Sequence, residues 1–108
     1  MSTFKNAIVT SVGTTASNVY VTPAGNTSIC IELDVSNRTT STISANVMIV
    51  DSSTGNTAFI VQLAPIPAGS ALQVVAGQKI VLEAGDSIQV QSTSASSLDA
   101  IGSILENV

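Results

Sequence analysis

Two carboxylates, Glu32 and Asp34, are the residues best spaced for acid–base chemistry, because they stand two positions apart in an alternating apolar run. Alternate residues of a strand point to the same face, which would bring the two groups close enough to influence each other's ionisation. The chain has no histidine, which excludes Ser-His-Asp and Cys-His arrangements and the commonest general base. With two Phe, one Tyr and no Trp there is also no sign of an aromatic-lined cleft. We therefore expect solvated carboxylates, no catalytic residue and no enzyme activity.

Two turn-forming stretches could offer oxygen ligands to a hard cation, residues 51–56 (DSSTGN) and 83–86 (EAGD). A calcium ion takes about six to eight oxygens, often from several carboxylates, and each stretch has only one or two. Asx and Ser/Thr turns explain the same residues without an ion. Cys30 is the only cysteine, so an internal disulfide and a thiolate-rich metal site are excluded. We expect no metal and no cofactor.

Charge is scarce, since only 9% of residues are charged and the formal net charge is −4. The three cations, Lys5, Arg38 and Lys79, are too few and too scattered to follow a phosphate backbone, so we expect no nucleic-acid binding. Apolar runs end after about four residues, whereas a membrane-spanning helix needs roughly 20, and no secretory signal is expected at the N-terminus. A weakly charged Ser/Thr-rich surface loses little desolvation energy against another protein, which favours large permanent contacts. The alternative is the ordinary polar surface of a secreted or virion protein.

Short strands between turns must position these residues. Pro23-Ala24-Gly25 and Pro67-Ala68-Gly69 are turn signatures, as is 83–87, and alternating apolar runs follow all three. Turn signals recur every 8 to 12 residues or so without helical periodicity of useful length. The sequence therefore predicts an all-β fold: an antiparallel, jelly-roll-like β-sandwich of about eight short strands, forming a single domain over residues 17–108. A helical alternative is open only for the stripe at positions 98, 101 and 105.

Alternation also predicts which side chains are buried. In the clearest strand, residues 28–36, one face would carry Ile29, Ile31, Leu33 and Val35, and the other Cys30, Glu32, Asp34 and Ser36. Residues 1–16 are polar and interrupted by glycine, so they are expected to form either an arm that reaches a neighbouring subunit or an ordinary edge strand. The residues expected to contact another subunit are Phe4, Lys5, Ile8 and Val12.

Short segments that resemble those of one group of known proteins occur along nearly the whole chain and in the same order. They are Phe4-Lys5-Asn6, Val12-Gly13-Thr14, residues 19–25, Val35-Ser36-Asn37, residues 64–70, residues 77–86, Ser97-Leu98-Asp99 and Leu105-Glu106. Together they resemble a group of small structural proteins of tailed bacteriophages, although each segment alone is generic turn and strand sequence.

This resemblance implies a β-sandwich located in the virion, assembled in the bacterial host cytoplasm and without an enzymatic role. It favours a capsid decoration (cement) protein that binds and stabilises the head lattice, with the major capsid protein or other virion proteins as partners. It also implies a homo-oligomer, with a trimer favoured. The alternatives are a neck or tail component, and a β-sandwich that binds glycans or the host surface. A glycan-binding module would need an exposed Tyr20 or a polar cleft.

Overall fold

The computed structural model describes residues 2–107, which form eight strands and no helix. The strands are β1 (Thr3–Val12), β2 (Ser17–Val21), β3 (Ser28–Asn37), β4 (Ile43–Val50), β5 (Thr57–Ile66), β6 (Ala71–Leu82), β7 (Ser87–Ser92) and β8 (Leu98–Glu106). The predicted all-β class is confirmed, and the C-terminal stripe is a strand, not a helix. Within the described residues no helix could cross a membrane.

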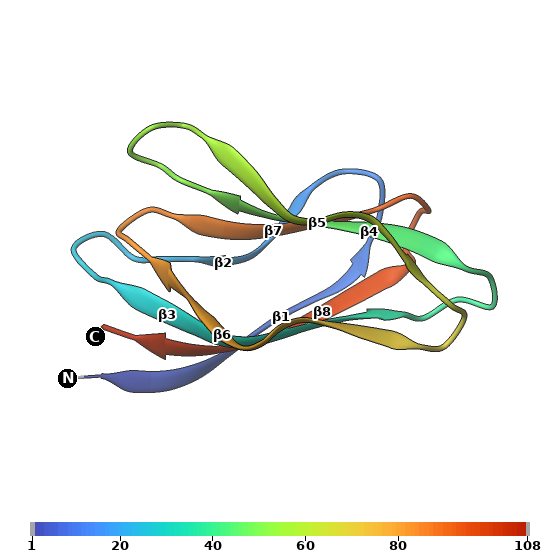
Figure 1. Ribbon diagram of the computed structural model, residues 1–108, viewed down its shortest axis with the longest axis horizontal. Helices are drawn as coiled ribbons and strands as arrows, with labels where there is room; N and C mark the ends of the chain where they lie inside the picture. The colour runs from blue at the N-terminus through green and yellow to red at the C-terminus, as the bar shows by residue number, and fades with distance from the viewer. Residues whose placement is uncertain (1, 108) are drawn as a thin grey trace.

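The strands form two antiparallel four-stranded sheets that stack as two layers (Figure 1). One has the order β1-β8-β3-β6 and the other β2-β7-β4-β5. Each strand of the first half of the chain pairs with its counterpart counted back from the C-terminus: β1 with β8, β2 with β7, β3 with β6 and β4 with β5. This is a long antiparallel ribbon rolled up on itself, the jelly roll. The predicted jelly-roll-like sandwich is confirmed.

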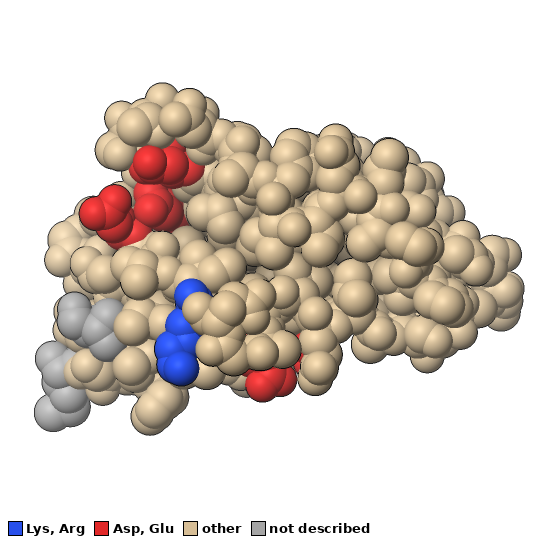
Figure 2. Space-filling model, in the orientation of Figure 1, with Lys and Arg blue, Asp and Glu red and all other residues tan. Residues whose placement is uncertain are grey.

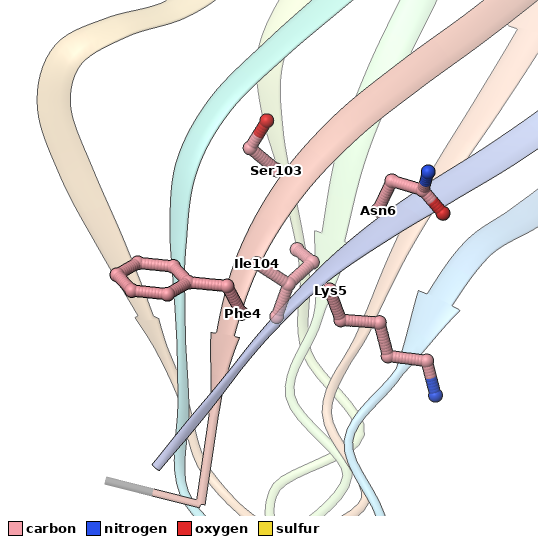
Figure 3. Close-up of a pocket in the computed structure, with 5 residues that line it drawn as sticks. All are labelled: Phe4, Lys5, Asn6, Ser103 and Ile104. Carbon is pink, nitrogen blue, oxygen red and sulfur yellow. The ribbon is translucent and has the colours of Figure 1, made fainter.

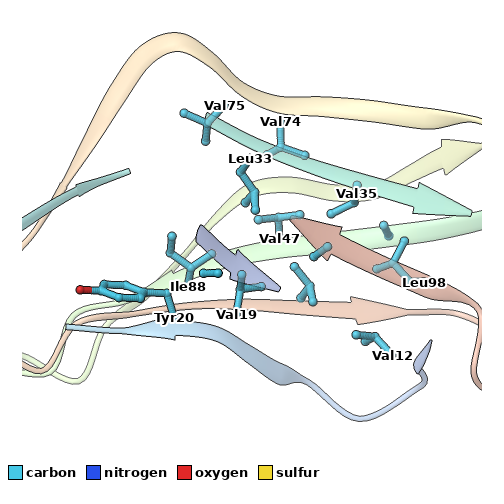
Figure 4. Close-up of a cluster of buried hydrophobic side chains, with 14 of the residues drawn as sticks. Val12, Val19, Tyr20, Leu33, Val35, Val47, Val74, Val75, Ile88 and Leu98 are labelled. Carbon is cyan, nitrogen blue, oxygen red and sulfur yellow. The ribbon is translucent and has the colours of Figure 1, made fainter. Parts of the chain in front are cut away.

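The core between the sheets is almost entirely aliphatic. Leu33 of β3 and Val47 of β4 are fully buried and face each other across the layers with Ile88 of β7 (Figure 4). Tyr20 is the only aromatic side chain in the core that the structure describes. β-Branched residues suit this arrangement because they lose little rotamer freedom on a pleated surface.

A β-bulge in β3 makes the predicted face assignment wrong for its first half. The register against both β6 and β8 shifts between Cys30 and Glu32. The extra residue offsets the alternation, so the buried side chains are Cys30, then Leu33 and Val35. Ile29 and Ile31 were predicted to be buried, but both are only partly buried and neither packs against the core cluster. Ile29 instead lies on the outer face, with Glu32.

Candidate functional site

The outer face of the β1-β8-β3-β6 sheet carries a row of apolar side chains that crosses all four strands. Phe4 lies opposite Leu105, Leu105 opposite Ile29, and Ile29 opposite Val81. Leu105, Ile29 and Val81 each stand next to a buried residue of their own strand, and Phe4 stands three positions before the buried Ala7. Because side chains alternate along a strand, all four point away from the core. The two ends of the row are the most exposed, Phe4 at 78% and Val81 at 62%. We call this set the outer row.

A second apolar pair extends this surface along β1 and β8. Ile8 lies opposite Ile101, and the two side chains are 56% and 52% exposed. A polar pair, Asn6 and Ser103, separates them from Phe4. The outer row and this pair together form what we call the outer apolar face. Exposed apolar side chains gathered on one face in this way are typical of protein–protein contact sites.

The four residues predicted to contact another subunit do not all reach this face. Phe4 and Ile8 lie on it. Lys5 extends from the opposite side of β1 (Figure 3), with its Nζ 3.8 Å from Glu106 Oε2. Val12 is 2% exposed and belongs to the core cluster. The β1–β8 register shifts between Val9 and Val12 and turns the Val12 side chain inward, away from the outer apolar face.

A shallow depression lies where β1 runs beside β8, next to Phe4. Its lining residues are Phe4, Lys5, Asn6, Ser103 and Ile104 (Figure 3), and its volume is about 270 Å³. Pockets that enclose small ligands are typically larger, roughly 300–1,000 Å³. The depression therefore suits a single side chain of a partner protein better than a small-molecule substrate.

Tyr20 ties the two sheets together at the end of the molecule where the termini lie. Its hydroxyl donates a hydrogen bond of 2.5 Å to Glu106 Oε2 of β8 and lies 2.9 Å from Ser28 Oγ of β3. Burial raises the pKa of Tyr20, and its hydrogen bond to the Glu106 carboxylate raises it further. The ring is only 7% exposed, so it offers no stacking platform to a sugar, and the glycan-binding alternative would need a polar cleft instead.

Glu32, Asp34 and Cys30 are not assembled into a reactive site. Glu32 is exposed on the outer face, whereas Asp34 is half-buried beside it and its Oδ1 is buried without a hydrogen-bond partner. Among the residues that the structure describes, neither carboxylate accepts a hydrogen bond from a side chain that could serve as its acid or base partner. Cys30 is fully buried, and this burial raises the pKa of its thiol to about 11. It therefore stays a protonated, packed side chain.

The two predicted turn stretches meet in space and bring three carboxylates together. Oxygens of Asp51, Glu83 and Asp86 lie within 4.8 Å of one another. Asp86 accepts backbone hydrogen bonds from Ser52 at 3.0 Å and Glu83 at 2.9 Å, and hydrogen bonds from Ser53 lower the pKa of Asp51. Asp86 thus joins the β4–β5 turn to the β6–β7 turn, whereas Asp51 accepts hydrogen bonds within its own turn. Figure 2 shows one group of acidic side chains at one end of a largely uncharged face and another at its lower edge.

No protein-family model and no curated protein sequence matches this chain. Solved structures with the same fold do exist. A chain of the T13 infectious bursal disease virus particle aligns over 97% of this chain and 30% of its own, with TM-score 0.58 and 10% identity. The Gx strain of that virus gives TM-score 0.51, 12% identity, and coverage of 95% and 32%. This chain thus spans about a third of those viral chains.

A bacterial structure is similar to the same degree. A subunit of Bacillus endospore appendages, described as disulfide-linked pili, aligns over 99% of this chain and 88% of its own, with TM-score 0.59 and 11% identity. At such identities the likeness extends to the fold alone. The chain therefore has a viral-capsid-like jelly-roll fold, which a bacterial pilus subunit also has.

Proposed function

We propose that this chain is a non-enzymatic structural protein of a tailed-bacteriophage virion, and that it acts as a capsid decoration (cement) protein. The observation that carries the proposal is the outer apolar face, a set of exposed apolar side chains on the β1-β8-β3-β6 sheet. The resemblance of the sequence to small phage structural proteins, and the capsid-like fold, agree with it.

The outer apolar face has the energetics of a permanent contact. Burying a Phe, Val, Leu or Ile side chain is worth about 1.5–3 kcal/mol. Burial of only the two exposed ends of the outer row would therefore contribute substantially to the free energy of binding. Glu32 and Asp34 border the row on the same sheet, so the complementary surface on the major capsid protein carries apolar side chains beside a basic one.

A fibre subunit is the second candidate, because the endospore appendage subunit aligns over 88% of its length. That structure is a disulfide-linked pilus, whereas here the only cysteine is fully buried in β3. A disulfide-linked fibre is therefore disfavoured. A neck or tail component would use the same outer apolar face at lower copy number.

A co-sedimentation experiment tests the proposal directly. Particles from a phage lacking this gene would be mixed with the purified protein and pelleted. We expect saturable binding, and Val81→Ser should weaken it at least about tenfold because it removes an anchor of the outer row. Phe59→Ser is the matched control, since Phe59 is an exposed apolar residue of the other sheet. Absence of binding, or a loss confined to Phe59→Ser, would contradict the proposal.

A further inference from the structure

One of the four sheet edges is regular enough to pair with another chain. The edge strands are β1 and β6 in one sheet and β2 and β5 in the other. Register shifts interrupt β2 between Asn18 and Tyr20, and two shifts each interrupt the ladders of β5 and β6. In β1, residues 3–9 pair with β8 without interruption. The other side of β1 has no strand partner among the described residues, so its backbone groups are open to an added strand.

We propose that this edge pairs with β1 of a second copy of the chain, antiparallel and about a two-fold axis at Asn6. In this register Phe4 lies opposite Ile8 of the partner subunit and Lys5 lies opposite Ala7 of the partner subunit. The pairing continues the sheet across both copies. This pairing goes beyond the proposed function, and neither proposal depends on the other.

The position of the axis follows from the side chains. Opposite residues of an antiparallel pair point to the same face, so the axis must coincide with a residue, not with the gap between two. An axis at Lys5 would place two ammonium groups opposite each other, which is destabilising. An axis at Ala7 would place Phe4 opposite Thr10 and Ile8 opposite Asn6. Only the axis at Asn6 pairs the exposed aromatic with the exposed β-branched residue and keeps the lysines apart.

The same register unites the apolar surfaces of the two copies. Ile101 already lies opposite Ile8, and Phe4 opposite Leu105, on the outer face. Pairing Ile8 with Phe4 of the partner subunit therefore joins these pairs into one apolar row across the two-fold axis. An aromatic–aliphatic cross-strand pair of this kind favours the assembly. The product is a dimer, in place of the trimer that the resemblance implies.

Disulfide trapping tests both the pairing and its register. Asn6→Cys places two thiols opposite each other, where Cα atoms are about 4.5–5.5 Å apart and a disulfide is geometrically allowed. Phe4→Cys and Ile8→Cys should each fail to cross-link alone, since like positions are then about 13 Å apart along the strands, but should cross-link when mixed. Ser103→Cys, on the same face but on β8, is the control. Cys30 is buried and does not compete.

The expected result is a non-reducing band at twice the 10.9 kDa of the chain for Asn6→Cys, and for the Phe4→Cys and Ile8→Cys mixture. Light scattering on the unmodified protein should likewise give twice the chain mass. A monomer or a trimer in light scattering would overturn the inference. So would equal cross-linking of Asn6→Cys and Ser103→Cys, and self-cross-linking of Phe4→Cys would overturn the register.

Discussion

At the scale of single residues, Tyr20 gives the clearest link between structure and pH. It is the only tyrosine, so near-ultraviolet absorbance follows its ionisation directly. Burial and the Glu106 carboxylate raise its pKa in the folded state above the ordinary value of about 10. A raised folded pKa means that the group stabilises the fold below about pH 10, and that this contribution is lost as the pH rises through the folded pKa.

We therefore expect tyrosinate absorbance to appear above pH 10 and to rise together with unfolding. Tyr20→Phe should remove this alkaline loss of stability and should cost about 1–3 kcal/mol at neutral pH, because a hydrogen bond to a charged group is lost. Denaturant unfolding at pH 7 and at about pH 11, below and above the ordinary tyrosine pKa of about 10, would measure both effects. If Tyr20 in the folded protein titrated with the ordinary tyrosine pKa of about 10, this account would be contradicted.

Leu33 and Ile31 test the bulge in β3, since both were predicted to be buried on one face. Leu33 is fully buried, whereas Ile31 is partly buried and lies outside the core cluster. Leu33→Ala should lower the free energy of unfolding by about 2–5 kcal/mol, and Ile31→Ala should cost clearly less. Chemical denaturation of the two variants measures the difference. Equal costs would mean that the alternation of β3 runs unbroken.

At the scale of elements, the turn at Gly85 depends on the absence of a side chain. Its φ is +84°, and a Cβ there would lie 2.7 Å from Ser52 Oγ of the β4–β5 turn. Gly69 has a similar φ of +69° but open space around it. Both alanine variants bear the left-handed backbone cost of about 1–2 kcal/mol, and Gly85→Ala adds the clash. Gly85→Ala should therefore melt at a lower temperature than Gly69→Ala, and equal melting temperatures would contradict this.

The elements show what the sequence could and could not predict. Alternation and turn residues are local, so the strands, the all-β class and most of the core were predictable. The bulges at Glu32 and before Val12 were not, because they arise from pairing with strands far along the chain. Burial in β8 also depends on pairing with distant strands. The alternation of its residues therefore defines two faces but does not show which of them is buried. The outer apolar face could thus be recognised only once Leu105 and Ile29 were seen to lie side by side.

At the scale of the whole molecule, the meeting of distant turns also escaped prediction. Asp51 and Asp86 are far apart in sequence, and only the jelly-roll strand order brings their turns together. Three of the four edges are protected by register shifts, and in β5 the Leu63 amide donates to Asn46 Oδ1, not to an added strand. Among the four edges, β1 is therefore the one best suited to pair with an added strand. Such restriction suits a subunit of a closed assembly more than one that polymerises at every edge.

The copy number of this chain in purified virions tests the central claim most directly. It would be measured by quantitative mass spectrometry against the major capsid protein. A decoration protein on a symmetric lattice should be present within a factor of about three of the capsid protein. A ratio below about one-tenth would contradict a decoration role and assign the chain to the neck or tail. Absence from the particles would contradict the virion function altogether.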